Sequence, residues 1–244
     1  MLEAFIASAI AGLATGLGAA VLLAFKRLSM RMFDSMIGFA AGVMTSASIF
    51  GLIRPGIESN GFWPMVTGFL VGALIVFWFD MHLPELFRKA GQPPPSRFVH
   101  QGFLMAGTIA LHNIPEGFAI GAGYASGKPG LGLILALAIA LQNIPEGTAV
   151  AAPLLAGGVR RRRALLLATV SGLIEPIAAI GGFACVQYLV GALPFAFGLA
   201  AGAMLYAVSH DLLPESHSHG YELAATWSFL LGFLVFLMLD HTLG

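Results

Sequence analysis

The sequence predicts an all-α integral membrane protein with eight transmembrane helices. Of its 244 residues, 58% are hydrophobic and only 10% are charged, and the mean hydropathy is +0.87. Soluble domains carry about 25% charged residues, so most of this surface must contact lipid. Apolar stretches near the roughly 20 residues that span a bilayer place the helices at 3–25, 36–53, 62–82, 100–124, 130–156, 163–188, 193–213 and 222–243. We predict one transmembrane domain, residues 1–244.

Charged residues, prolines and turn residues separate the eight stretches in order. Lys26 and Arg27 end the first stretch, and Arg54 with Pro55 ends the second. A QPPPS segment precedes the fourth stretch and a GKPG turn precedes the fifth. A run of arginines precedes the sixth, a GALP turn the seventh, and a SHSHG segment the eighth. Because the cations of the first stretch follow its apolar run, we predict a retained helix rather than a signal peptide.

The cations also predict the orientation. Ten of the twelve Lys and Arg residues fall in the loops after the first, third and fifth helices: Lys26, Arg27, Arg31, Arg88, Lys89, Arg97 and Arg160, Arg161, Arg162 and Arg163. Only Arg54 and Lys128 lie on the opposite side. The positive-inside rule therefore places those three loops in the cytoplasm and both termini outside.

Charge and cysteine content exclude two classes of partner. The net charge is zero and the isoelectric point is near 7.1, so the chain has no basic excess with which to bind nucleic acid. The single cysteine, Cys185, excludes a disulfide framework and a site built from several thiolates.

Polar residues gather at the centres of three consecutive predicted helices. They are His112, Asn113 and Glu116 in HNIPEG, Gln142, Asn143 and Glu146 in QNIPEG, and Glu175 in SGLIEP. Ionisable residues inside a membrane are by default candidates for a functional site. No Lys or Arg lies at this depth to neutralise three carboxylates, so we predict a cation site.

Helical spacing divides these residues into two adjacent sets. His112 and Glu116 are four residues apart, as are Gln142 and Glu146, so each pair shares a face. The two asparagines are offset by about 100° and face a second direction, which allows two ions bridged by Glu116 and Glu146. Each carboxylate also adjoins a proline, and proline frees a backbone carbonyl. For Glu175 taken by itself, a role as a buried, hydrogen-bonded packing residue is as good an explanation as a role as a metal ligand.

The two NIPEG segments form a short repeat. They lie thirty residues apart on consecutive helices, which should run antiparallel and be related by an axis in the membrane plane, as in inverted-repeat transporters. Met44, near the centre of the second helix, is a candidate thioether ligand for a soft metal. With ten methionines in the chain, gap filling is the alternative role.

These motifs resemble the ZIP family (Zrt-, Irt-like proteins) of metal-ion transporters, in particular its bacterial members. The resemblance extends to GFAAGVMTSAS, SGLIEP, AGAMLYAVSHDLLPESH and LDHTLG, and covers all eight helices. It implies a 3+2+3 helix arrangement with both termini outside, a multi-pass protein of the bacterial inner membrane, and import of divalent metal, chiefly zinc, with cadmium, iron or manganese as alternatives. It also implies a homodimer, and a bundle that slides or rocks against a scaffold.

The resemblance implies a binuclear metal centre. Its first site would consist of Met44, His112, Glu116, Gln142 and Glu146, and its second of Asn113, Glu116, Asn143, Glu146 and Glu175. Two positions depart from the family, which often has histidine at Gln142 and, in close bacterial relatives, an acid at Asn143. Amides are uncharged and harder ligands than imidazole, so we expect weaker binding at the second site.

Acids and histidines at the helix ends mark an entrance and an exit. Glu58 and Asp240 are the predicted entrance. The predicted exit residues, toward the cytosol, are Asp80, His82, His210, Asp211, Glu215, His217 and His219. Ordinary interfacial solvation explains each of them equally well. The loop before the fourth helix has no histidine, and the SHSH segment with His217 and His219 is the candidate substitute for a metal-binding loop.

We therefore predict a divalent-metal importer. The alternative from another class is an intramembrane zinc-dependent hydrolase, because His, Glu and Gln around zinc with an open position could activate water. The chain has no HExxH motif and only one imidazole in the cluster, which disfavours that alternative. A structural or assembly role would leave the buried acids unexplained.

Overall fold

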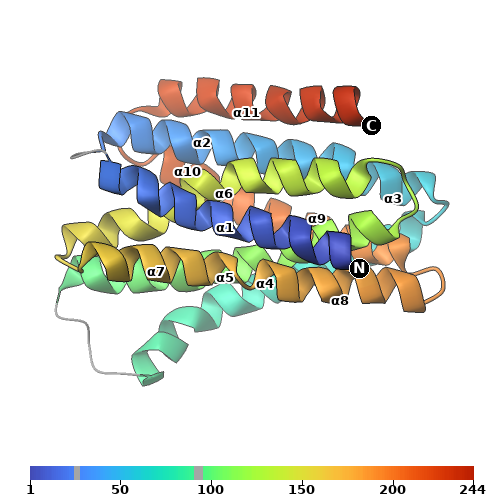
Figure 1. Cartoon of the computed structure of the whole chain (residues 1–244), viewed down its shortest axis with the longest axis horizontal. Coiled ribbons are helices and arrows are strands. Elements are labelled where there is room, and N and C mark those ends of the chain that lie inside the picture. Colours follow the sequence, from blue (N-terminus) through green and yellow to red (C-terminus); the bar gives the residue numbers. More distant parts are fainter. Residues whose placement is uncertain (25–27, 91–95) are drawn as a thin grey trace.

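The computed structural model describes residues 1–24, 28–90 and 96–244, and every regular element in this part of the chain is helical (Figure 1). In order these are α1 (Leu2–Ala24), α2 (Met30–Ser46), η1 (Ala47–Ile53), α3 (Arg54–Glu58), α4 (Phe62–Ala90), α5 (Arg97–Ala125), α6 (Leu131–Ala156), α7 (Arg161–Gly172), α8 (Glu175–Tyr188), α9 (Leu193–Ala207), η2 (Val208–Leu212), α10 (Leu213–Ser216) and α11 (Glu222–Leu243). The η elements are π-helical.

Consecutive elements join into the eight helical stretches that the sequence predicts. Elements α2, η1 and α3 form one stretch, as do α7 with α8, and α9, η2 and α10. Seven stretches are long and apolar enough to cross a membrane. The eighth, α5, has 29 residues and carries the polar HNIPEG segment within it. The chain is a multi-pass membrane protein.

The two largest differences from the predicted helix boundaries are at the start of the second helix and the end of the third. The second helix, expected from residue 36, begins at Met30, because the Ser29 side chain caps it by accepting a hydrogen bond from the Met32 amide. The third continues to Ala90 rather than ending at 82. Of the cations used to predict the orientation, Lys26 and Arg27 lie outside the described residues, as do the side chains of Arg88 and Lys89.

The sixth helical stretch is interrupted just before its buried acid, Glu175. Helices α5 and α6 continue through Pro115 and Pro145, whereas α7 ends at Gly172 and α8 begins at Glu175, with Pro176 in its first turn. The π-helical turns η1 and η2 widen the second and seventh stretches, a feature that often accompanies functional sites.

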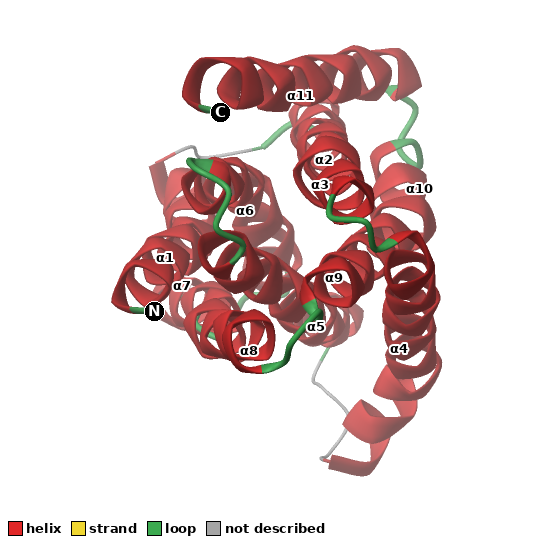
Figure 2. Cartoon of the chain, turned by 90° about the vertical axis from the view of Figure 1, so that its right-hand side faces the viewer, coloured by secondary structure: helices red, strands yellow, loops and turns green. Residues whose placement is uncertain are grey.

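The helices form two groups (Figure 2). In the first, which we call the arc group, α2 packs along α11 and α4 packs along α9. In the second, the site group, α1 packs along α6 and α5 packs along α8, with α7 against α1. The groups meet chiefly where α2 contacts α6 and where α5 contacts α9.

Close helix approach occurs inside each group. At Gly42 in the arc group and at Gly147 and Gly182 in the site group, an added Cβ would overlap a backbone carbonyl oxygen of the neighbouring helix. Other helical glycines make the same kind of contact. In every case among the described residues, the glycine and the carbonyl oxygen belong to helices of the same group. Between the groups, an added Cβ at Gly51 would instead meet the Leu135 side chain, and the non-helical Gly130 approaches the Leu243 carbonyl oxygen at the end of α11.

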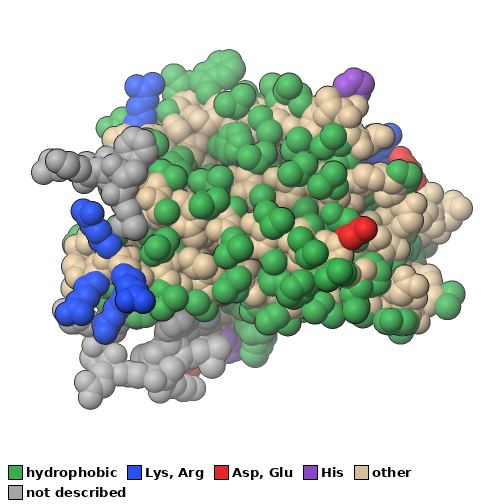
Figure 3. All heavy atoms as spheres, in the orientation of Figure 1, with side chains coloured by type: hydrophobic (Ala, Val, Ile, Leu, Met, Phe, Trp, Pro, Cys, Tyr) green, Lys and Arg blue, Asp and Glu red, His purple; other side chains and the backbone are tan. Residues whose placement is uncertain are grey.

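The two ends of the molecule differ. Both chain termini lie at one end, which we call the terminal end (Figure 1). At the other, the arginine end, α2, α5 and α7 begin, and the surface Lys and Arg side chains gather there, while apolar side chains cover much of the face between the ends (Figure 3). This distribution matches a protein that spans a bilayer along its long axis.

Candidate metal site

The polar residues predicted to form the centre are brought together by α5, α6 and the start of α8. All are buried, with at most 3% of any of them exposed: His112, Asn113, Glu116, Gln142, Asn143, Glu146 and Glu175. The helical spacing of four places His112 over Glu116 and Gln142 over Glu146, and packing of α5 on α6 turns the two faces toward each other.

Two hydrogen bonds link the cluster across helices. Gln142 Nε2 donates to Glu116 Oε1 at 2.7 Å, and Asn143 Nδ2 donates to Glu175 Oε1 at 2.6 Å. The bonds join α6 to α5 and α6 to α8. Each of the three helices is therefore tied to another through a pair of site residues, Gln142 with Glu116 and Asn143 with Glu175.

Backbone contacts orient the two asparagines. Asn113 Nδ2 donates to the Ser171 carbonyl oxygen of α7 at 2.8 Å, and Asn143 Nδ2 donates to the Ala11 carbonyl oxygen of α1 at 2.8 Å. With each amide nitrogen held by a neighbouring backbone, the amide oxygens are left as the free acceptors. An amide oxygen is the atom through which asparagine binds a cation.

Many polar atoms of this cluster are buried without a hydrogen-bond partner. They are both nitrogens of His112, Asn113 Oδ1, Glu116 Oε2, Gln142 Oε1, Asn143 Oδ1, both carboxylate oxygens of Glu146, and Glu175 Oε2. Each buried unpaired polar group costs about 1–3 kcal/mol, and more when it is charged. Among the described residues no Lys or Arg side chain is buried, so these acceptors fit a bound cation.

A second group of possible ligands adjoins the first. Single ligand atoms of Asp80, His112 and Asp211 all lie within 4.8 Å of one another. His112 Nε2 is 3.3 Å from Asp211 Oδ2, close enough for an ion pair although without hydrogen-bond geometry. Since His112 also lies one turn from Glu116 on α5, its ring stands between the two groups.

A cavity of about 400 Å³ reaches the centre from the arginine end. It is lined by His112 and Glu146 at its inner part and by His210, Asp211 and Glu215 further out. A second cavity, of about 620 Å³, shares Gln101, Met105, Ala149 and Glu215 with it and extends to His219 and Met30. The two cavities together connect the buried cluster to the arginine end.

Apolar side chains fill the interior on the other side of the cluster. Toward the terminal end, Leu52, Leu135, Ile139, Phe197 and Phe236 are fully buried and belong to one packed core. They come from η1, α6, α9 and α11, so both helix groups contribute. The structure is therefore open toward one end and closed toward the other.

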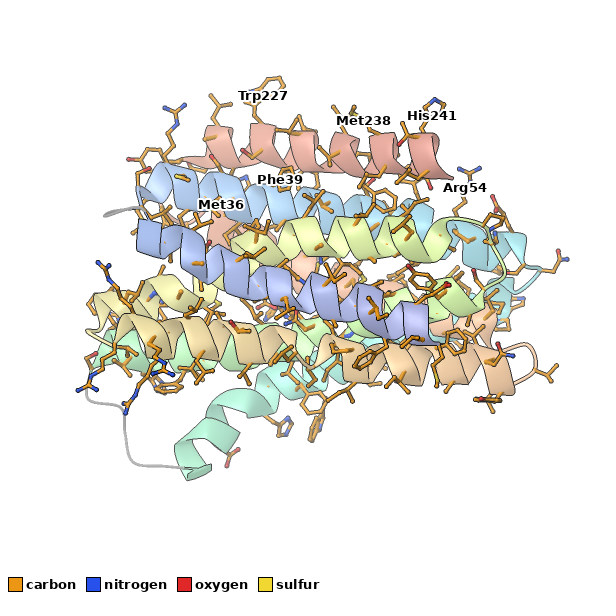
Figure 4. All side chains as sticks on the ribbon, viewed as in Figure 1. Met36, Phe39, Arg54, Trp227, Met238 and His241 are labelled. Atoms are coloured by element: carbon orange, nitrogen blue, oxygen red, sulfur yellow. The ribbon has the colours of Figure 1, made fainter. Side chains whose placement is uncertain are left out.

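The two predicted entrance residues lie at the terminal end. Glu58 is exposed and accepts from Arg54 Nε at 2.9 Å and from Lys128 Nζ at 3.0 Å. Asp240 is half-buried near the end of α11. Figure 4 places Arg54 and His241, their neighbours in the sequence, at the same end. No contact joins either acid to the buried cluster in the described part of the chain.

The predicted exit residues divide into those that reach the cavity and those that do not. Asp80 and Asp211 join His112, while His210 and Glu215 line the cavity. His82 is exposed and stacks on Trp78, and its Nδ1 lies 2.7 Å from the Trp78 carbonyl oxygen.

The two histidines of SHSH contact different helices. His217 Nε2 lies 3.2 Å from Thr226 Oγ1 of α11, whereas His219 Nδ1 lies 2.8 Å from Asp34 Oδ1 of α2. The segment therefore does not turn both rings toward one point.

Sequence reasoning missed Asp34. Its side chain is fully buried, one oxygen is bound to His219 and the other has no partner. The residue was placed before the second helix because that helix was predicted to begin at 36. The Ser29 cap is the signal that could have extended the helix, and it would have put Asp34 on the same face as Ile37 and Ala41.

Met44 is fully buried on α2, which packs against α6. It belongs to the apolar core, which by itself accounts for its burial. Its predicted role as a thioether ligand stays a prediction.

Fold and site together define a multi-pass membrane protein with a buried carboxylate, amide and imidazole centre, and in the described part of the chain no Lys or Arg side chain is buried with it. The chain belongs to the ZIP zinc transporter family: the family model described as "ZIP Zinc transporter" matches residues 88–240. It is 41% identical over 241 residues to the zinc transporter ZIPB of Bordetella bronchiseptica, covering 95% of this chain and 78% of that one. It is 36% identical over 249 residues to the zinc transporter GufA of Myxococcus xanthus, covering 98% of each.

A third relative is the zinc transporter ZupT of Corynebacterium glutamicum, which is 36% identical over 256 residues, covering 96% of this chain and 97% of that one. Because these similarities cover 95–98% of this chain, they include every helix that contributes to the buried centre.

Proposed function

We propose that this protein imports zinc across the bacterial inner membrane into the cytosol through the buried centre on α5, α6 and α8. The observation that carries the proposal is the set of buried acceptor atoms without partners, at the inner end of a cavity and with no buried cation among the described residues. The relatives named as zinc transporters support zinc as the ion.

The proposed centre has two positions for metal. The first would use Met44, His112, Glu116, Gln142 and Glu146, and the second Asn113, Glu116, Asn143, Glu146 and Glu175. Imidazole and carboxylate are common zinc ligands. Three carboxylates leave two divalent ions one positive charge in excess, so we propose that the second position, rich in amides, binds more weakly.

The proposed path runs from the terminal end to the arginine end. Glu58 and Asp240 would collect ions outside, and the arginine end would face the cytosol, as the positive-inside rule requires. From Glu146 the ion would pass to Asp80 and Asp211, and the His112 ring, which lies between these groups, would bind it on the way. Beyond that, His210, Glu215 and the Asp34–His219 pair would lead it along the two cavities.

We propose that the site group moves as a unit against the arc group. Support comes from the close backbone contacts of the helical glycines, which all lie within one group, and from the side-chain contact of Gly51 with Leu135 between the groups. The helix pairs also correspond. The packing of α1 on α6 has its counterpart in the packing of α8 on α5, and the packing of α2 on α11 has its counterpart in the packing of α9 on α4. That correspondence is what a 3+2+3 arrangement with inverted repeats requires.

Cross-linking the two groups should stop transport. An added Cβ at Gly51 of η1 would lie 3.7 Å from Leu135 Cγ of α6, so a mercury bridge between Gly51→Cys and Leu135→Cys, in a Cys185→Ala background, should join the groups. We expect zinc uptake to fall to background and to return after thiol reduction. The matched control is Gly16→Cys with Thr169→Cys, which joins α1 to α7 inside the site group, with Cβ positions 3.3 Å apart. Equal uptake after complete cross-linking of the first pair would contradict movement between the groups.

The proposed function is tested by uptake into proteoliposomes. We expect saturable zinc entry, read by an internal dye, with cadmium, iron and manganese tested alongside to rank the ions. If folded protein moved none of these ions, the importer proposal would fail. The zinc-dependent hydrolase, which nothing in the site favours over transport, would then be assayed with peptide and ester substrates.

A further inference from the structure

The arginine run at the start of α7 is a concentrated charge that the protein itself does not neutralise. Arg160, Arg161, Arg162 and Arg163 are all exposed. No carboxylate of the described residues lies within ion-pair distance of any of them, and the first turn of α7 contains no acid. Adjacent guanidinium groups repel one another, and at a helix N-terminus they also meet the positive end of the helix dipole.

The opposite end of the molecule is built differently. There, Arg54 and Lys128 both bind the carboxylate of Glu58, at 2.9 and 3.0 Å. The chain thus pairs its cations with a carboxylate at the terminal end and leaves four unpaired together at the arginine end, where the Lys and Arg side chains gather (Figure 3). Among the described residues, no carboxylate supplies a counter-charge to these four.

Two of the four arginines continue a lipid-facing stripe. Leu166, Val170 and Ile177 are exposed along α7 and α8. Arg162 precedes Leu166 by four residues and Arg163 precedes it by three, so both lie on the same helix face as this stripe. Long cationic side chains at the end of such a stripe reach the level of the lipid headgroups.

The other two arginines belong to a different face. Arg160 precedes Ala164 by four residues and Arg161 precedes it by three, and Ala164 and Ala168 are fully buried against the neighbouring helices. The helix therefore presents Arg162 and Arg163 to the lipid boundary, and Arg160 and Arg161 above the protein interior. The two pairs carry the same charge.

We propose that Arg162 and Arg163 form a binding site for the phosphate of an anionic phospholipid in the leaflet at the arginine end. The acyl chains of this lipid lie along the apolar stripe of α7 and α8, and its headgroup supplies the anion that the arginines lack. Guanidinium binds phosphate through paired N–H donors. This site is separate from the metal path, since none of its residues lines either cavity of that path.

The test is a lipid titration of the full chain purified in an uncharged detergent. Dioctanoyl-phosphatidylglycerol should raise the midpoint of thermal unfolding in a saturable way, because a ligand that binds only the folded state stabilises it. Dioctanoyl-phosphatidylcholine at equal concentration should not. The apparent Kd for phosphatidylglycerol should weaken at least about fivefold in R162Q/R163Q, the factor that one arginine near an anionic surface contributes.

The matched control is R160Q/R161Q, which removes the same charge from the same turn and should change the apparent Kd less than about twofold. The single variant R162Q should weaken binding by an intermediate factor, and it decides the question if the double variant does not fold. Equal weakening by the two pairs, an equal shift from phosphatidylcholine, or an equal shift from inorganic phosphate would each overturn the proposal. The last result would indicate a soluble anion rather than a lipid.

Discussion

Replacing Glu146 with glutamine is expected to abolish zinc uptake in proteoliposomes while leaving the protein folded. Glu146 is fully buried, neither of its carboxylate oxygens has a partner, and it lines the cavity that reaches the centre. In the proposed centre it binds both metal positions. Glutamine keeps the volume and removes the charge, so a buried acceptor for a cation is lost without a cavity being created.

The expected loss is at least about 100-fold in uptake, because removing even a group that only supports a ligand costs about 10–100-fold. The control is Glu222→Gln on the exposed first turn of α11, which should leave uptake unchanged within about twofold. Both variants are compared with the unaltered protein by thermal unfolding. Uptake by folded Glu146→Gln within twofold of the unaltered protein would remove Glu146 from the proposed centre.

Replacing Gly182 with alanine is expected to destabilise the protein, whereas the same change at the adjacent Gly181 is not. A Cβ at Gly182 would overlap the Phe118 carbonyl oxygen of α5, but a Cβ at Gly181 meets no atom within 4 Å. Overpacking a close contact costs about 1–3 kcal/mol. Alanine at an open helix position instead gains up to about 1 kcal/mol over glycine.

Thermal unfolding in one detergent measures both changes. The midpoint should fall for Gly182→Ala and stay level or rise for Gly181→Ala. Because the contact holds α8 against α5, and α8 carries Glu175, zinc uptake by Gly182→Ala should fall as well. Equal midpoints for the two variants would show that α5 and α8 are not in close contact at this point.

The number and placement of the helices were predictable because a bilayer imposes a simple rule on sequence. Each span must be apolar over about 20 residues, and the interruptions at Lys26, the QPPPS segment and the GKPG turn are local. The failures were also local. The start of the second helix was predicted too late because Arg31 was assigned to the loop after the first helix, whereas the structure has the helix begin after the Ser29 cap and include both Arg31 and the buried Asp34.

The polar centre was predictable as a set of residues, because buried acids without cations are rare in a membrane. Its connections were not. The hydrogen bonds of Asn113 to Ser171 and of Asn143 to Ala11 join residues 58 and 132 positions apart, and helical spacing carries no information on such pairs. The approach of Asp80 and Asp211 to His112 likewise depends on how α4, α5 and the η2 turn are placed.

The sequence by itself determined that this chain is a helical membrane protein, where its spans lie, and which polar residues lie deep in them. Those properties follow from hydropathy and helical periodicity, which act over one to six turns. Only the tertiary structure decided that the helices form two groups, that the centre is open to the arginine end, and that Asp34 is bound to His219. These depend on side-chain packing between distant helices, because within lipid the helices attract one another by close fit and hydrogen bonds rather than by hydropathy.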